Sequence, residues 1–220
     1  KRLYTMFRKF GFGSKTGIDS PGETAGSLAH YKKWTSVDTG AIAFGYGVSV
    51  SAIQLVTAAS AIANGGILMK PYLVQAITDQ SGAPLKQFQP QTVRRVLSKK
   101  TARTVKVIMK TVTTKGGTGV NAALDGYTVC GKTGTVRKLD KSGTYANDRH
   151  MASFVGFTPA DNPKLAILVV IDEPQRKYYG GTVAAPVFRQ IAREALNYLN
   201  IAPGSGVKRF ATSRRIEVSG

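Results

Sequence analysis

The chain has 220 residues, of which 42% are hydrophobic and 9% aromatic; this composition supports a globular core and excludes a disordered polypeptide. The formal net charge is +19, from 31 basic and 12 acidic residues. The single cysteine, Cys130, excludes an internal disulfide and stands among apolar residues, which predicts a buried rather than a reactive thiol. Two histidines far from that cysteine give no metal-site spacing, so we expect neither a metal nor a cofactor.

The first part of the chain predicts two helices separated by a long loop. Residues 1–10 place apolar side chains at helical spacing before a pair of glycines, which is typical of the last turns of a helix. Residues 14–39 are rich in Gly, Ser, Pro and Lys and predict an extended loop. A second helix is expected to begin near Ser49 or Ser51 and to end at residues 64–66. Its packed face is expected to consist of Ile53, Val56, Ala59 and Ala63.

The middle of the chain predicts two strands and a third helix. Residues 67–78 are typical of extended structure with Pro71 inside it, hence an edge or loop-like strand, and residues 87–97 contain another strand. Ser98 is a suitable N-cap for a helix that continues through Lys110 and stops at two glycines. The packed side of this helix is expected to consist of Val105, Ile108, Met109 and Val112.

The last part predicts three strands followed by a helix. The strands are expected at residues 127–136, 150–157 and 165–171, and the unbroken apolar run of the third predicts a strand buried on both faces. Residues 183–199 have helical spacing, and residues 203–220 predict a basic, poorly ordered tail. The apolar positions of the helix are Val187, Ile191, Ala195, Leu196 and Leu199.

The stretch GYTVCGKTGT, residues 126–135, matches two unrelated patterns. Its glycines with Lys132 and Thr133 fit the phosphate loop G-x-x-x-x-G-K-[ST], whereas Lys132-Thr133-Gly134-Thr135 fits the K-T-G element of penicillin-binding proteins and serine β-lactamases. A phosphate loop must lead straight into a helix, because helix N-terminal N–H groups bind the phosphates. The β-branched residues around the lysine favour a strand instead, so the sequence favours the K-T-G interpretation.

The positive charge is concentrated between residues 80 and 124, where no acidic residue occurs. Such a segment attracts polyanions, including nucleic acid, anionic lipid and acidic wall polymers. The alternative is a solvated basic face without a specific partner. The basic residues are Lys86, Arg94, Arg95, Lys99, Lys100, Arg103, Lys106, Lys110 and Lys115.

Several stretches between Phe10 and Pro203 together resemble the class B penicillin-binding proteins, the monofunctional peptidoglycan D,D-transpeptidases. The resemblance implies an α+β fold of the penicillin-binding protein and serine β-lactamase type, in which an antiparallel sheet is packed by helices. Residues 1–202 would be the C-terminal part of the transpeptidase domain, and the upstream strands and nucleophile helix would be missing. The stretches are GFGSKTGID (11–19), FGYGVSVSAIQL (44–55), the ANGG run (63–68), GYTVCGKTGT (126–135), DRHMASFVGFTPADNP (148–163), VVIDEP (169–174) and YYGGTVAAPVF (178–188).

The resemblance also implies an activity. The family acylates a serine with the D-Ala-D-Ala end of a stem peptide, and an amine of a second stem peptide then attacks to form the cross-link; β-lactams trap the acyl-enzyme. Lys132 would supply positive charge and take part in proton transfer. Thr133, Gly134 and Thr135 would line the substrate, with both threonines bonding its carboxylate and the Thr135 backbone N–H forming half of the oxyanion hole.

Tyr178 and Tyr179 resemble the family's aromatic wall beside the substrate, although core packing at a helix start is an equal alternative. The family's nucleophile lies in an S-x-x-K motif and a second motif is S-x-N, both upstream of K-T-G. The expectation from the sequence is that this chain contains neither motif. The nucleophile, the general base and half of the oxyanion hole would then lie outside it, and the chain alone would be inactive.

The expected partners are a peptidoglycan stem peptide, β-lactam antibiotics and the upstream half of the domain. Cell-wall synthesis proteins would bind through the parent protein, and no nucleic acid is expected. The parent would act in cell division or cell shape. It would lie in the cell envelope on the extracytoplasmic (periplasmic) side of the membrane. An N-terminal helix absent here would anchor it to that membrane.

Two other classes of protein stay open from the residues alone. One is a non-catalytic basic module that binds an anionic polymer, which salt-sensitive binding without a β-lactam response would favour. The other is a nucleotide-binding enzyme built on a phosphate loop, which ATP would stabilise.

Overall fold

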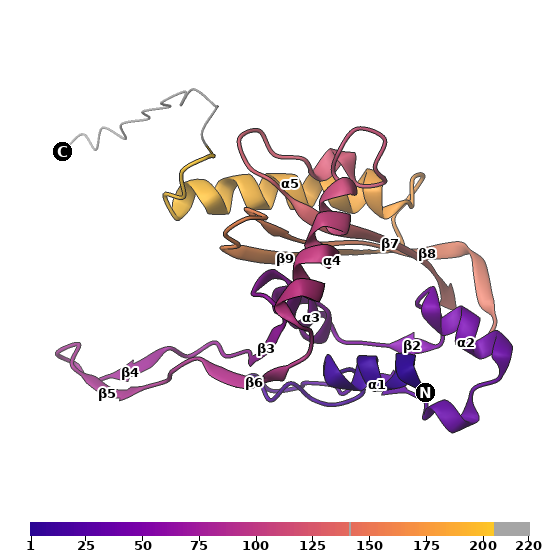
Figure 1. Cartoon of the computed structure of the whole chain (residues 1–220), viewed down its shortest axis with the longest axis horizontal. Coiled ribbons are helices and arrows are strands. Elements are labelled where there is room, and N and C mark those ends of the chain that lie inside the picture. Colours follow the sequence, from indigo (N-terminus) through magenta and orange to yellow (C-terminus); the bar gives the residue numbers. More distant parts are fainter. Residues whose placement is uncertain (141, 205–220) are drawn as a thin grey trace.

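The computed structural model describes residues 1–140 and 142–204, and its centre is a three-stranded antiparallel sheet (Figure 1). Its strands are β7 (Cys130–Leu139), β8 (Tyr145–Thr158) and β9 (Leu165–Asp172), in that order. All three predicted strands are confirmed. The turn between β7 and β8 begins at Asp140, whose Oδ1 accepts hydrogen bonds from the backbone N–H groups of Ser142 and Thr144.

The prediction that the third strand is buried on both faces was wrong. Val169 is buried in β9, but Val170 is 44% exposed. β9 is the last strand of the sheet in the described part of the chain, so one long edge has no paired neighbour there. An unbroken apolar run therefore marks a strand that is only partly covered by this chain.

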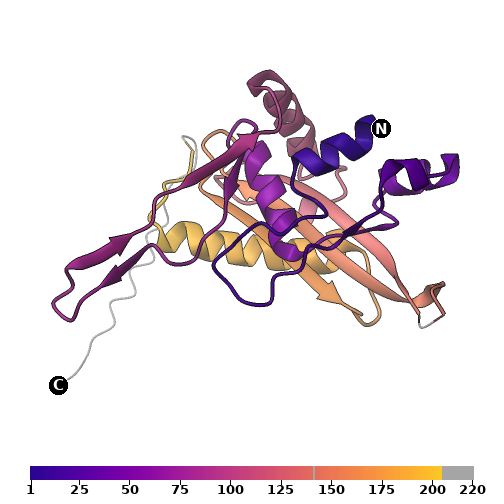
Figure 2. The same cartoon turned by 90° about the horizontal axis from the view of Figure 1, so that it is seen from below.

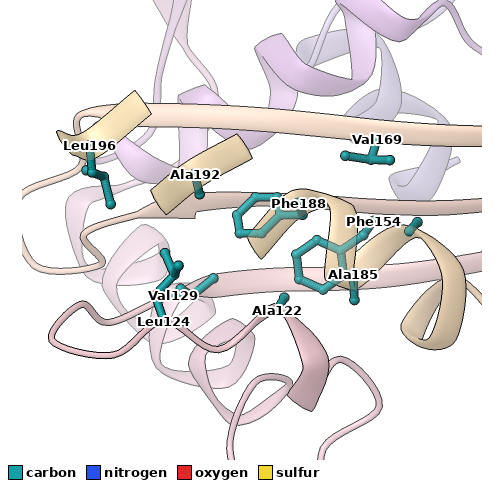
Figure 3. Packing of buried hydrophobic residues seen from close by; sticks show 10 residues of the cluster. Ala122, Leu124, Val129, Phe154, Val169, Ala185, Phe188, Ala192 and Leu196 are labelled. Carbon is teal, nitrogen blue, oxygen red and sulfur yellow. The ribbon is translucent and has the colours of Figure 1, made fainter. Parts of the chain in front are cut away.

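Helices cover both faces of the sheet, which gives three layers (Figure 1). α5 (Gly180–Tyr198) lies on one face, while α3 (Ala52–Ala63) and α4 (Lys99–Thr111) lie on the other. Phe154 of β8 and Phe188 of α5 are both fully buried, with ring centroids 4.7 Å apart in an edge-on arrangement (Figure 3). Aromatic pairs of this geometry add to the free energy gained by burial.

α5 packs through a different face from the one predicted. Gly180, Ala184, Phe188, Ala192 and Leu196, four residues apart, are all buried. In this row the small residues Gly180, Ala184 and Ala192 let the helix approach the sheet closely, and Phe188 and Leu196 fill the core. Leu196 was predicted correctly, but the other large members of the predicted stripe are well exposed: Val187 at 38%, Ile191 at 44% and Leu199 at 49%.

α3 begins and ends where the sequence predicted, with a capping box at its start. The Ser51 hydroxyl oxygen accepts from the Gln54 backbone N–H, and Gln54 Oε1 accepts from the Ser51 N–H. Gln54 is 1% exposed, and its side-chain amide also donates hydrogen bonds to carbonyl oxygens of the N-terminal loop, which satisfy this buried polar group. Of the predicted face, Ala59 and Ala63 are buried as expected, whereas Ile53 and Val56 are only half-buried. The other buried residues of the helix are Gln54, Thr57, Ala58 and Ala61.

α4 is also confirmed, with the Ser98 hydroxyl oxygen accepting from the Thr101 backbone N–H at 3.0 Å. Ala102 is fully buried and Met109 is half-buried, but Ile108 is 61% exposed and so lies outside the packed side.

The N-terminal region holds more structure than the sequence suggested. α1 (Arg2–Lys9) is confirmed, but the predicted loop 14–39 was wrong at its end, because α2 (Ser36–Ala43) begins there. Thr35 and Asp38 form a reciprocal capping box that starts α2. The remaining elements of this region are the short strand β1 (Ser27–Leu28), which pairs with β2 (Val48–Ser49), and the 3-10 helix η1 (Tyr31–Lys33).

A two-stranded arm projects from the body, as two perpendicular views show (Figures 1 and 2). At its base β3 (Ile67–Lys70) pairs with β6 (Gln91–Arg95), and at its tip β4 (Ala76–Thr78) pairs with β5 (Pro84–Gln87). The single strand predicted over residues 67–78 was wrong, because residues 71–75 divide the extended segment into β3 and β4. A second 3-10 turn, η2 (Val120–Ala122), precedes the sheet.

Two expectations concern the end of the chain. The boundary after residue 202 stays a prediction. The basic tail 203–220 falls almost entirely on residues 205–220, which lie outside the described residues. Across residues 1–140 and 142–204, no helix has the length and apolar character needed to cross a bilayer.

Candidate active site

The K-T-G element lies in an edge strand. Lys132 to Thr135 occupy the first half of β7, opposite Val155 to Ala152 of β8. In the described part of the chain, the other edge of β7 has no paired strand. The phosphate-loop interpretation was wrong, because Thr133 is followed by six more residues of strand and not by a helix.

The two threonines point to the α5 side of the sheet, because alternate side chains of a strand share one face. The Thr135 hydroxyl oxygen accepts a hydrogen bond from the backbone N–H of Gly180, the first residue of α5, at 3.0 Å. Alternation places Lys132 on the other face, where it is exposed, and its Nζ donates to the Thr133 carbonyl oxygen at 2.6 Å. Lys132 and the two threonines therefore lie on opposite faces of the same edge strand.

The loop after α4 also meets this strand. The hydroxyl groups of Thr118 and Thr133 lie 3.1 Å apart, and the Asn121 side-chain amide donates to the Gly181 carbonyl oxygen at 2.8 Å. Neither Thr118 nor Asn121 was predicted from the sequence. The one local signal was the glycine-rich run around Thr118, because glycines permit close backbone approach.

Glycines make this junction tight. A Cβ atom added to Gly180 would collide with the carbonyl oxygens of Ser153 and Gly134, and one added to Gly181 would collide with the Thr118 carbonyl oxygen. Gly134 itself faces the Ser153 hydroxyl group, which a side chain would displace. The first turn of α5 can therefore lie directly against the K-T-G strand only because these positions lack side chains.

Aromatic rings line the next part of the same edge. Tyr178 stacks on His150 with centroids 4.0 Å apart and planes 14° apart, and Tyr179 lies 4.6 Å from Tyr178. Tyr178 is 37% exposed and Tyr179 61%, so the core-packing alternative was wrong. The hydrogen bond with Tyr179 and the charge of the Tyr179 side chain raise the pKa of Tyr178, whereas the positive charge of Arg137 lowers it. His150 was not predicted from the sequence.

Lys138 fixes the start of the segment that carries both tyrosines. Its Nζ lies 2.7 Å from Glu173 Oε1 and 2.9 Å from Asp172 Oδ1, and the hydrogen bonds to Glu173 and Asp172 raise the pKa of Lys138. Glu173 has a φ of 48° and Arg176 a φ of 69°, a left-handed conformation that is unfavourable for side-chain-bearing residues. The ion pairs thus hold a strained turn between β9 and α5.

Cys130 is fully buried, as predicted. Burial raises the pKa of its thiol to about 11, although Lys106 and Lys110 oppose this. The Cys130 Sγ lies 3.2 Å from the Lys106 carbonyl oxygen, in donor geometry. A buried neutral thiol of this kind is unsuited to nucleophilic chemistry.

The combination of an edge-strand K-T-G-T sequence, an antiparallel sheet and a C-terminal helix docked on that strand defines the penicillin-binding type of α+β fold. Residues 1–193 match the model of the penicillin-binding protein transpeptidase domain, and the chain belongs to this family. It is 40% identical to stage V sporulation protein D of Bacillus subtilis over 205 residues, 92% of this chain and 31% of that protein. It is 38% identical to the probable peptidoglycan D,D-transpeptidase PenA of Neisseria gonorrhoeae, again over 92% of this chain, and 33% of that protein.

Solved structures agree with this assignment. The transpeptidase domain of Burkholderia pseudomallei penicillin-binding protein 3 superposes with a TM-score of 0.80 at 36% identity, over 93% of this chain and 59% of that one. Penicillin-binding protein 3 of Mycobacterium tuberculosis in complex with ampicillin gives 0.85 at 33% identity, over 94% and 48%. The predicted fold class and family are confirmed, and the chain spans about a third of the length of the curated relatives named above.

One sequence expectation about the nucleophile was wrong. Ser205 is followed three residues later by Lys208, so S-x-x-K spacing does occur in this chain, whereas S-x-N does not. Ser205 and Lys208 lie outside the described residues and beyond residue 193, where the family match ends. They also follow the K-T-G element, whereas the family's nucleophile motif is expected to precede it.

Proposed function

We propose that this chain forms one wall of the active-site cleft in a peptidoglycan D,D-transpeptidase. By the parent protein we mean a longer polypeptide that joins this chain to the upstream half of its domain. The observation that supports the proposal most is the free edge of β7, where K-T-G-T lies against the N-terminus of α5 through Thr135 and Gly180. In the parent, a serine that lies outside residues 1–193 is acylated by a stem peptide and passes the acyl group to a second stem peptide.

Lys132 supplies positive charge at the free edge, which attracts the terminal carboxylate of the donor peptide and stabilises developing charge during acylation. The Thr133 and Thr135 hydroxyl groups bond that carboxylate, and the Thr135 backbone N–H forms half of the oxyanion hole. The contacts from Thr118 and Gly180 support these roles, because they fix the two threonine side chains before substrate arrives.

Tyr178 and Tyr179 form an aromatic wall at the end of the site. Their exposure, and the stacking of Tyr178 on His150, support this role, because a fixed and open ring surface is what an apolar substrate group can pack against. Lys138 positions the wall by holding Asp172 and Glu173.

The substrate is a stem peptide ending in D-Ala-D-Ala, and β-lactams acylate the same serine. This proposal is supported by relatives named as peptidoglycan D,D-transpeptidases and by solved structures described as complexes with ampicillin and aztreonam. The parent acts in the cell envelope on the extracytoplasmic side, anchored outside this chain, and serves cell division, cell shape or a related wall process with other wall-synthesis proteins.

This chain alone is inactive under the proposal, because the serine nucleophile and its base come from the upstream half. Acylation by a fluorescent penicillin tests both statements. The parent protein should be labelled, and Lys132→Met should lower its acylation rate constant by about 10²-fold or more, since one stabilising charge is lost. The exposed Lys164 offers a matched control, and Lys164→Met should leave the rate unchanged.

The isolated chain should stay unlabelled. Labelling at Ser205 in this experiment would contradict the proposal, because it would place a working nucleophile after the K-T-G element. Equal acylation of the Lys132→Met and Lys164→Met parents would contradict the role of Lys132.

A further inference from the structure

α4 carries an exposed row of basic side chains that the transpeptidase site does not use. Residues 99, 103, 106 and 110 recur at the spacing of one helical face, and Lys100 lies beside them. Lys106 is partly buried and its Nζ bonds the Ala160 carbonyl oxygen at 3.3 Å. The other four are exposed, and we call them the α4 basic stripe: Lys99, Lys100, Arg103 and Lys110.

The stripe is electrostatically unfavourable for the helix itself. Lys99 and Lys100 stand in the first turn, which holds no acidic residue, so two cations lie at the positive end of the helix dipole. Lys99 and Arg103 are like charges one turn apart, which repel. Residues that oppose local stability in this way are typical of functional sites.

Within the described part of the chain, none of the four stripe side chains takes part in an ion pair. Residues 80–124 contain no acidic residue, and the ion pairs found among residues 1–140 and 142–204 involve Lys138 and Arg189 instead. Near the C-terminal half of the helix, the charge of Asp161 raises the pKa of Cys130, whereas Lys106 and Lys110 lower it. The stripe is therefore free to bind an external anion.

The form of the stripe selects the kind of anion. Lys99 and Arg103 are separated by one turn, about 6 Å along the axis, and the stripe extends over about 16 Å to Lys110. A linear polymer with regularly spaced charges can contact all of it at once, whereas one phosphate ion cannot. α4 contains no aromatic residue on which bases could stack, and its exposed apolar residues are only Val107 and Ile108, which is little for membrane insertion.

We propose that the α4 basic stripe binds an anionic cell-wall polymer of phosphodiester repeats, lying along the helix. α4 packs against α3 and β7, and its N-terminal half, which carries Lys99, Lys100 and Arg103, lies on the α3 side of the sheet, away from α5 (Figure 1). The inference goes beyond the proposed function, because it requires neither the K-T-G strand nor a nucleophile.

Binding of fluorescent poly(glycerol phosphate) to the parent protein tests this, measured over a series of salt concentrations. The variant is the triple substitution Lys99→Gln, Lys100→Gln, Arg103→Gln. The control triple, Lys32→Gln, Lys33→Gln, Arg193→Gln, removes the same charge from exposed positions elsewhere. The α4 triple should weaken binding at least tenfold in low salt and reduce the slope of log K against log salt by about 2, since about 0.7 counterion is released per contact. The control should change affinity less than threefold.

Equal weakening by the two triples would overturn the proposal, because net charge alone would then explain binding. It would also be overturned if the α4 triple abolished binding to phosphatidylglycerol vesicles but left polymer binding intact, which would indicate a membrane surface. Both triples should keep the parental rate of acylation by fluorescent penicillin, which shows that they fold. If the proposed transpeptidase function is wrong, the unmodified parent will not be acylated by fluorescent penicillin, whether or not it binds the polymer.

Discussion

The backbone N–H of Gly180 donates to the Thr135 hydroxyl oxygen at 3.0 Å, which joins the first residue of α5 to the last residue of the K-T-G-T sequence. The two residues are 45 positions apart in the chain. A Cβ at Gly180 would collide with the carbonyl oxygens of Gly134 and Ser153. The geometry of the K-T-G strand therefore depends on a glycine in another element.

Gly180→Ala should damage the site more than the fold. The added methyl group pushes the start of α5 away from β7 and breaks the bond to Thr135, so acylation of the parent by fluorescent penicillin should slow by about 10²-fold, as small misplacements in active sites do. Gly40→Ala is the matched control, because Gly40 lies in α2 with ordinary φ and open space around it. It should leave acylation unchanged and raise helix stability by up to about 1 kcal/mol. A parental acylation rate for Gly180→Ala would show that the contact is dispensable.

Lys138→Met should loosen the segment that carries Tyr178 and Tyr179. Removing the ammonium group leaves Asp172 and Glu173 unpaired at the start of a strained turn. Acylation of the parent should slow by about tenfold, because the aromatic wall is no longer held in place. Lys164→Met again serves as the control, and a rate for Lys138→Met equal to that control would rule out a positioning role.

The pH dependence of the Lys138 effect has a defined sign. Its pKa is raised by the hydrogen bonds to Glu173 and Asp172. The contribution to stability is therefore fully present below the unfolded value of about 10.4 and is lost as pH rises through the higher folded value. The difference in unfolding free energy between the wild type and Lys138→Met should be constant around neutral pH and shrink as the pH rises into strong alkali.

Gln54→Leu should destabilise the fold strongly. The Gln54 amide group donates to the Ser14 carbonyl oxygen at 2.7 Å and to that of Ala25 at 2.9 Å, and the side chain is 1% exposed. Leucine leaves these partly buried carbonyl groups without their donor, at a cost of about 2–3 kcal/mol in the free energy of unfolding. Chemical denaturation of the parent measures it.

Gln190→Leu is the matched substitution on the surface of α5, and it should change the free energy by no more than about 0.5 kcal/mol. Equal effects of the two substitutions would mean that the Gln54 bonds contribute nothing beyond side-chain volume.

Local sequence patterns predicted the K-T-G strand well, because its β-branched residues and its motif are contiguous. The start of α3 followed from Ser51 for the same reason. α2 was missed because residues 14–39 look like a loop by composition, although Thr35 and Asp38 have the spacing of a capping box.

Long-range contacts could not be predicted in this way. The stacking of His150 on Tyr178 and the bond from Gly180 to Thr135 join different elements, and no local pattern indicates which elements meet. The packed face of α5 was misjudged because large apolar residues such as Ile191 suggested the core, whereas close approach to the sheet selects small ones such as Ala192.

Asp19 ties the N-terminal loop to the base of the projecting arm, and this tie should weaken in acid. Its carboxylate oxygens accept from the backbone N–H groups of Val74 at 3.0 Å and Leu73 at 2.7 Å, and these bonds, with a smaller effect of Lys70, lower the pKa of Asp19. A lowered folded pKa means that the contribution to stability is present above the unfolded value of about 3.9 and is lost as pH falls through the lower folded value.

Asp19→Asn should therefore be less stable than the wild type at neutral pH, because the amide has one acceptor oxygen in place of two and no charge. The difference in unfolding free energy between the two proteins should vanish progressively as pH falls below about 4, because the protonated Asp19 side chain is then uncharged, like asparagine. Urea unfolding of both proteins from pH 7 to pH 2 measures this, with Asp148→Asn on β8 as the exposed control. A gap between wild type and Asp19→Asn that stays constant over the whole range would show that the charge on Asp19 does not hold the arm.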